Sequence, residues 1–176
     1  MRLSRLGPNA VTIAFEGRVD RFEPSEAAEL ESRGATTIVF AIHQRSSPIR
    51  AWLDALACAF DVPGSRRHAA AFLGRSAPQS GLGAHQDGRQ HILMVQLEGE
   101  REITLWRPID RGDPRRGVRE CDAPAADATC MVVLAPGMAV YMPPWTPHRA
   151  DVGGRSLSVS FAVEALEVDD SSRPLE

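Results

Sequence analysis

A series of short apolar runs, separated by turn-forming residues, constrains the fold more than any other feature of the chain. Val, Ile, Leu and Phe predominate in the runs, and Gly, Pro, Asp and Ser separate them. The expected strands cover residues 68–73, 84–87, 91–98, 101–106, 130–134, 138–142 and 155–163. Many short strands without a helical period are typical of a β-sandwich or a barrel.

The N-terminal part of the chain combines expected strands with helical patterns. Residues 11–15 and 35–42 are rich in β-branched and apolar side chains, which favours strands. Residues 24–32 form a polar helical pattern that Gly34 ends, and residues 47–60 carry a first-turn proline and an apolar face at helical spacing. We therefore expect a mostly β fold with one or two N-terminal helices packed outside it.

Length and composition indicate one ordinary globular domain. The 176 residues are enough to bury a core, and we expect residues 1–164 to form the domain and residues 165–176 a polar C-terminal tail. A net charge of -3 without a basic block argues against nucleic-acid binding, and no apolar run approaches the length of a membrane span. Three cysteines without CxxC spacing favour a reducing, cytoplasmic location.

His85, Asp87 and His148 are the side chains that point most directly to chemistry. Alternate residues of a strand share a face, so His85 and Asp87 are expected to point together into the barrel. His148 follows a proline-rich corner, residues 141–147, whose stiff backbone suits a precisely placed ligand. Two imidazoles and one carboxylate are the ligand set that holds a non-haem Fe(II) with open positions.

These residues belong to a wider pattern. Residues 35–163 resemble the JmjC-like cupins of the ribosomal-oxygenase type, which are Fe(II)- and 2-oxoglutarate-dependent hydroxylases built on a double-stranded β-helix, a cupin or jelly-roll barrel. Five segments carry the resemblance in matching order and approximate spacing: residues 83–87, 95–101, 134–137, 141–148 and 156–160.

The resemblance implies roles for single residues. His85, Asp87 and His148 fall on the family's iron ligands, which implies Fe(II) with 2-oxoglutarate and O2 as co-substrates. Arg101 falls where the family places a Lys or Arg that binds the distal carboxylate of 2-oxoglutarate. A guanidinium suits that role, because it binds a carboxylate through two parallel hydrogen bonds and stays charged when it is desolvated.

The chain departs from the family at one co-substrate contact. The family commonly has Asn-x-Tyr on the strand before the HxD loop, whereas residues 70–72 read Ala-Ala-Phe and offer no polar side-chain atom. Ser76 and Ser158 are our candidates for replacement donors. Small polar residues in a solvated loop or on a solvated strand face would produce the same pattern.

Three further residues have less specific interpretations. His91 begins an apolar strand, and we expect it to be packed or hydrogen-bonded rather than a fourth ligand. His68 lies beside arginines at the edge of an expected strand, which indicates a surface residue. Trp145 in the proline-rich corner is expected to pack rather than to line the site.

The resemblance implies an oxygenase that hydroxylates or otherwise oxidises an unactivated C–H bond. The family's helical and winged-helix segments do not follow the barrel here, so the sequence favours a small molecule, amino acid or peptide as substrate; a protein side chain is the alternative. A metal-dependent cupin enzyme that does not use 2-oxoglutarate and a non-catalytic cupin binding module are alternative functions, and a homodimer is possible.

Overall fold

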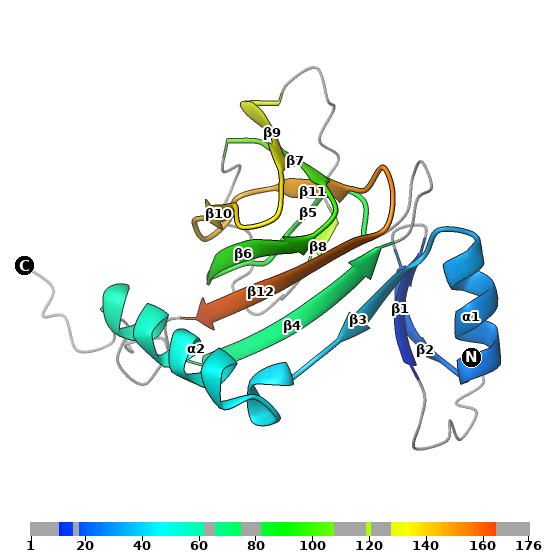
Figure 1. Ribbon diagram of the computed structural model, residues 1–176. Helices are drawn as coiled ribbons and strands as arrows, with labels where there is room; N and C mark the ends of the chain where they lie inside the picture. The colour runs from blue at the N-terminus through cyan, green and yellow to red at the C-terminus, as the bar shows by residue number, and fades with distance from the viewer. Residues whose placement is uncertain are drawn as a thin grey trace, which may run out of the picture.

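The fold consists of two antiparallel sheets that face each other, as the ribbon of the computed structural model shows (Figure 1). The structure describes residues 11–15, 18–61, 66–74, 82–107, 119–120 and 128–164. The larger sheet contains, in spatial order, β10 (Ala139–Met142), β6 (Gln90–Glu98), β12 (Ser156–Glu164), β4 (Arg66–Gly74), β3 (Thr36–Val39), β1 (Val11–Phe15) and β2 (Arg18–Phe22). The smaller sheet contains β8 (Arg119–Glu120), β5 (His85–Gln86), β11 (His148–Asp151), β7 (Arg101–Leu105) and β9 (Cys130–Leu134).

The space between the sheets is filled by side chains that alternate along the strands. On β6, Ile92 and Met94 are buried while the intervening positions are less so, which is the two-residue period of a strand with one covered face. They pack against Ile103 of the opposite sheet, and Leu134, Met142 and Ala162 complete this cluster. This arrangement confirms the predicted mostly β cupin barrel.

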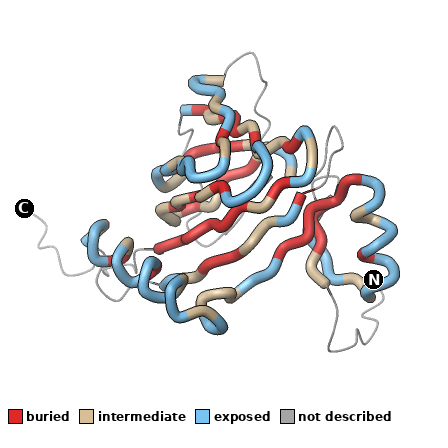
Figure 2. Tube along the Cα trace, viewed as in Figure 1, coloured by how far each residue is buried: buried red, intermediate tan, exposed pale blue. Residues whose placement is uncertain are grey.

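Two helices cover the outer face of the larger sheet (Figures 1 and 2). Helix α2 (Ser47–Ala59) buries Leu53 and Ala57 against β4 and β12, and complete burial of a leucine side chain contributes about 1.5–3 kcal/mol. Helix α1 (Pro24–Ser32) begins with a capping box between Glu23 and Glu26, and its Ala27 packs near β1. Among the described residues, no helix has the length and apolar character that crossing a membrane requires.

The differences from the sequence-based prediction have local causes. Strands β2 and β11 were not expected, because Arg-Val-Asp-Arg-Phe and His-Arg-Ala-Asp are polar. The strand expected over residues 35–42 ends at Val39, because Ala41 is left-handed (φ 57°) and the 3-10 helix η1 (Ile42–Gln44) follows it. The tail at residues 165–176 and most of the loop expected over residues 107–129 lie outside the described residues.

The hairpin between β6 and β7 depends on Gly99. Its φ of 65° is left-handed, and a Cβ added there would collide with the carbonyl oxygen of Arg155, which is backbone and has little room to move. The hairpin fixes the register in which β7 begins at Arg101. Gly99 therefore positions a residue that the sequence assigns to the site.

Gly99→Ala should lower the free energy of unfolding by at least about 2 kcal/mol, through left-handed strain and the clash with Arg155. Urea unfolding followed by circular dichroism would measure it. Gly153→Ala is the matched control, because a Cβ there meets no atom within 4 Å, and its effect should stay within about 0.5 kcal/mol. Equal stability of the two variants would contradict this account of the hairpin.

Candidate active site

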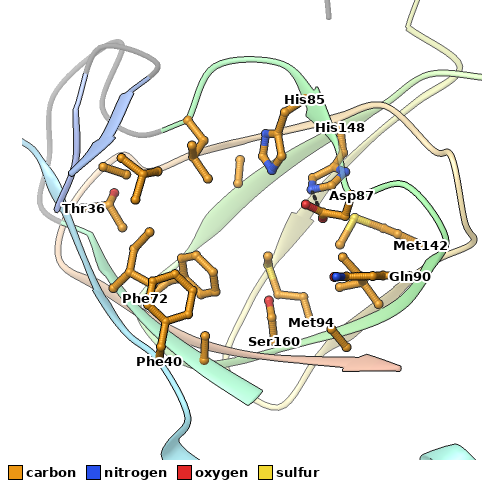
Figure 3. A pocket seen from close by; sticks show the side chains of 18 of the residues that line it. Thr36, Phe40, Phe72, His85, Asp87, Gln90, Met94, Met142, His148 and Ser160 are labelled. Atoms are coloured by element: carbon orange, nitrogen blue, oxygen red, sulfur yellow. Dashed lines mark ion pairs between the residues drawn. The ribbon is translucent and has the colours of Figure 1, made fainter. Parts of the chain in front are cut away.

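His85, Asp87 and His148 converge at one end of the space between the sheets (Figure 3). His85 and His148 are directly opposite each other in the antiparallel pairing of β5 with β11, and their ring centroids lie 4.3 Å apart. The side chain of Asp87 reaches the same point, with Oδ2 3.5 Å from Nε2 of His148. One potential ligand atom from each residue lies within 4.8 Å of the other two. The predicted grouping is therefore present, although β5 ends at Gln86 and Asp87 follows it.

Backbone carbonyls orient both imidazoles. Nδ1 of His85 lies 3.0 Å from the carbonyl oxygen of Gly83, and Nδ1 of His148 lies 3.1 Å from that of Thr146. A carbonyl oxygen only accepts hydrogen bonds, so each Nδ1 carries the proton and donates it. The lone pair of each neutral ring is then on Nε2, which is the arrangement that a metal-binding histidine needs.

One backbone hydrogen bond ties together the two segments that carry the ligands. The amide of Trp145 donates to the carbonyl of Gly88 at 2.7 Å, so the corner before His148 is fixed to the turn after Asp87. Trp145 has a φ of 64°, which is unusual for a bulky residue and persists only where the surroundings impose it. As expected, Trp145 is not among the described residues that line the cavity.

Burial favours the neutral form of His148, which is the form that binds a metal. Desolvation is the main cause that lowers the pKa of His148 below its usual 6.5, the neighbouring His85 lowers it further, and Asp87 opposes both. Because a metal binds the neutral imidazole, this lowered pKa keeps His148 in its ligand form at neutral pH.

A cavity of about 450 Å³ opens in front of the three ligands. Its lining includes Met94, Met142 and Ser160 from the larger sheet and Arg101 from β7 of the smaller sheet. The volume lies in the range of sites that hold small ligands. The metal-binding group and the predicted co-substrate residue therefore share one cavity.

Arg101 is a buried cation without a counter-ion among the described residues. Only 3% of the residue is exposed, and its Nε and Nη2 have no hydrogen-bond partner in the part of the chain that the structure describes. Burial lowers its pKa to about 10, so it remains charged at neutral pH. The guanidinium lies close to the backbone of Gly74, where an added Cβ would be 3.4 Å from Nη2. A buried charge without a partner lowers the stability of the fold unless a ligand of opposite charge pairs with it.

Ser158 and Ser76, the candidate replacement donors, and Phe72, which replaces the family's tyrosine, can be placed relative to the cavity only in part. Phe72 lines the cavity and offers no polar atom there. Ser158 is fully buried, and its Oγ has no partner among the described residues; Ser160, two residues along the same face of β12, lines the cavity. Ser76 lies outside the described residues. A co-substrate role for Ser158 and Ser76 stays a prediction.

Part of the cavity lining differs from what the sequence predicts. His68 was expected on the surface, but it lines the cavity because β4 lies inside the larger sheet; the two-residue alternation of His68, Ala70 and Phe72 is a signal that could have found it. Strands β1 to β3 also supply a wall that no local pattern predicted. His91 does have the expected packed role, with Nδ1 2.8 Å from the Tyr141 hydroxyl and its ring stacked on Phe60.

Known proteins share this sequence pattern and fold. The sequence model of the JmjC domain family matches residues 42–170. No curated protein matches the chain. Escherichia coli YcfD superposes with a TM-score of 0.65 at 18% identity, over 93% of this chain and 44% of that chain. YcfD as a ribosomal oxygenase in complex with cobalt and 2-oxoglutarate gives 0.63 at 17% identity, over 93% and 42%.

A structure from another class of enzyme has a related fold. L-ribose isomerase from Cellulomonas parahominis without ligand superposes with a TM-score of 0.51 at 14% identity, over 92% of this chain and 74% of that chain. At such identities these likenesses concern the fold alone. The chain spans about half of the length of the YcfD chains.

The comparisons correct the expected partner. The preference for a small molecule or short peptide is wrong, because the YcfD chains, which superpose with higher TM-scores than the isomerase, are ribosomal oxygenases.

Asp87→Ala should weaken Co(II) or Fe(II) binding by more than about 100-fold, because loss of a ligand should exceed the loss seen when only its supporting contacts are removed. Anaerobic calorimetric titration would measure the affinity. Asp151→Ala is the control, since Asp151 lies on β11 beside His148 but pairs with Arg149 at 2.7 Å. Unchanged metal binding in Asp87→Ala would disprove the ligand assignment.

Proposed function

The chain belongs to the JmjC domain family, and on that premise we propose that it is an Fe(II)- and 2-oxoglutarate-dependent oxygenase. The observation that carries the proposal is that one cavity contains both the His-Asp-His group and the buried Arg101, whose Nε and Nη2 have no hydrogen-bond partner among the described residues. The first supplies the donors of a metal site, and the second supplies a cation that a dicarboxylate would satisfy.

The three ligands suit Fe(II). His85 and His148 present neutral Nε2 atoms held by backbone carbonyls, and Asp87 adds one negative charge. Two imidazoles and one carboxylate leave positions on a six-coordinate ion for other ligands. The bound ion would supply the redox chemistry by which O2 and 2-oxoglutarate oxidise a C–H bond to C–OH, with one oxygen atom entering the product, the other entering succinate, and CO2 released.

Arg101 would bind the far carboxylate of 2-oxoglutarate. Nε and Nη2, which have no partner among the described residues, match a bidentate ion pair, and the low-dielectric surroundings would strengthen that pair. Ser158 is proposed as an additional donor, supported by its complete burial and by a hydroxyl that has no described partner. The apolar walls around these groups would keep water from the reacting atoms.

We propose a protein side chain as the substrate. The ribosomal oxygenases among the similar structures support this choice. The mouth of the cavity also supports it, because Val19 and Phe40 line the cavity while remaining 43% and 53% exposed. A side chain that projects from another protein could enter the cavity there while the rest of that protein stays outside.

A second candidate is a metal-dependent cupin that does not use 2-oxoglutarate, such as an isomerase. Phe72 favours it, because this side chain stands where the family commonly has a tyrosine that contacts the co-substrate. The related fold of L-ribose isomerase shows that the same architecture serves that class. Both candidates retain the metal site, so the co-substrate decides between them.

Adding 2-oxoglutarate to the anaerobic Fe(II) protein should produce a weak visible metal-to-ligand charge-transfer band, and adding O2 should then release succinate. Absorption spectroscopy and succinate quantification test the two steps separately. If Fe(II) binds but neither the band nor succinate appears, the alternative without 2-oxoglutarate is correct.

Arg101→Met should weaken 2-oxoglutarate binding about tenfold to a hundredfold, because it removes charge-assisted hydrogen bonds. The same change should leave the free energy of unfolding unchanged or higher, since it removes a buried charge that has no described partner. Titration of the charge-transfer band and urea unfolding would measure the two effects.

Two further variants make this test specific. Arg101→Lys should retain part of the affinity, and Arg155→Met, which removes a guanidinium whose side chain is 85% exposed, should leave the affinity unchanged. Equal 2-oxoglutarate affinity in Arg101→Met and the unaltered protein would refute the co-substrate role of Arg101.

A further inference from the structure

The cavity has a second wall that neither the metal ligands nor Arg101 explains. Apart from Thr36 of β3, the side chains that β1, β2, β3, Phe40, Phe72 of β4 and Leu82 contribute to this wall carry no hydrogen-bonding group. We call this wall the apolar recess; it consists of Ala14, Val19, Ile38, Phe40, Phe72 and Leu82. Figure 3 shows Phe40 and Phe72 across the cavity from His85, His148 and Asp87.

The recess includes both exposed and buried apolar side chains. Val19 and Phe40 are 43% and 53% exposed, whereas Ile38 and Ala14 are 4% and 1% exposed. Ala14 and Ile38 belong to one buried cluster with Ala70, and Phe72 and Leu82 pack against it. Exposed apolar side chains at the rim of a cavity are typical of a surface that binds a partner.

The charges along the cavity exclude a charged occupant of the recess. Among the described lining residues, the acidic side chain is Asp87 and the basic guanidinium is Arg101, and both have roles in the proposed function. Burial lowers the pKa of His68, so this lining residue is neutral at pH 7. A guanidinium, ammonium or carboxylate placed in the buried part of the recess would lose hydration without gaining a counter-ion from the described lining, which costs several kcal/mol per ion.

We propose that the apolar recess binds an uncharged branched-aliphatic or aromatic side chain of the substrate protein and directs its C–H bond toward the metal site. This inference rests on the proposed oxygenase function and specifies the class of side chain that is oxidised. Burial of such a side chain against the recess supplies the binding energy, and arginine, lysine and acidic side chains are disfavoured because the described lining offers them no free counter-ion.

The test uses short peptides that are identical except for a central leucine, phenylalanine, arginine or glutamate. Each peptide is titrated into the anaerobic Fe(II)–2-oxoglutarate protein, followed by the change in the charge-transfer band, and into the metal-free protein, followed by NMR of isoleucine and leucine methyl groups. The leucine and phenylalanine peptides should bind at least about tenfold more tightly than the charged ones.

Two valines that are equally exposed provide a matched pair of variants. Val19 and Val39 are both 43% exposed on strands of the larger sheet, but only Val19 is among the residues that line the cavity. Val19→Glu should weaken binding of the leucine peptide about tenfold and reduce or reverse its preference over the arginine peptide. Val39→Glu should leave both affinities unchanged, and urea unfolding would confirm that both variants fold.

Equal affinity for all peptides, a preference for a charged peptide, or equal effects of the two valine variants would overturn the inference. If the peptides show no preference although 2-oxoglutarate produces its band, the oxygenase proposal stands and the recess assignment falls. If no band appears, the titration of the metal-free protein still decides whether the recess selects apolar side chains.

Discussion

The pairing of β5 with β11 is the contact on which the rest of the site depends. It sets His85 directly opposite His148, although 63 positions separate them in the sequence. The carbonyls of Gly83 and Thr146 then fix the tautomer of each ring, and the hydrogen bond from Trp145 to Gly88 fixes the turn after Asp87. Backbone groups do most of this work, so the geometry of the ligands follows from the fold and not from flexible side-chain contacts.

The interior combines a stable apolar core with groups that lower stability. The cluster around Ile92 and Ile103 holds the two sheets together, while Arg101 and Ser158 are buried beside it with polar atoms that lack described partners. A core selected for stability alone would pair or remove such groups. Their presence is understandable if a dicarboxylate accepts hydrogen bonds from them. The stability that the fold loses by burying these groups is then linked to the proposed function.

An element could be predicted from the sequence where neighbouring residues alone determine it. Helix α1 and strand β9 have the predicted bounds, because a helical pattern that a glycine ends and a short apolar run are local properties of the sequence. Strand β11 was missed, because its four mostly polar residues become a strand only through pairing with β5 and β7. The place of the half-buried His68 in the cavity lining was missed for the same reason, since β12 and β3 flank β4 only after folding.

The sequence by itself determined the mostly β fold, the ligand types of the metal site and the family resemblance, because strand periodicity, turn residues and ordered motifs are written along the chain. The tertiary structure alone decided which groups share the cavity. It brought Arg101 into the same space as His85 and His148, and it placed β1 to β3 so that Val19, Ile38 and Phe40 form an apolar wall. The physical reason is that a cavity is shaped by contacts between segments far apart in the sequence, and no local pattern specifies what will face what.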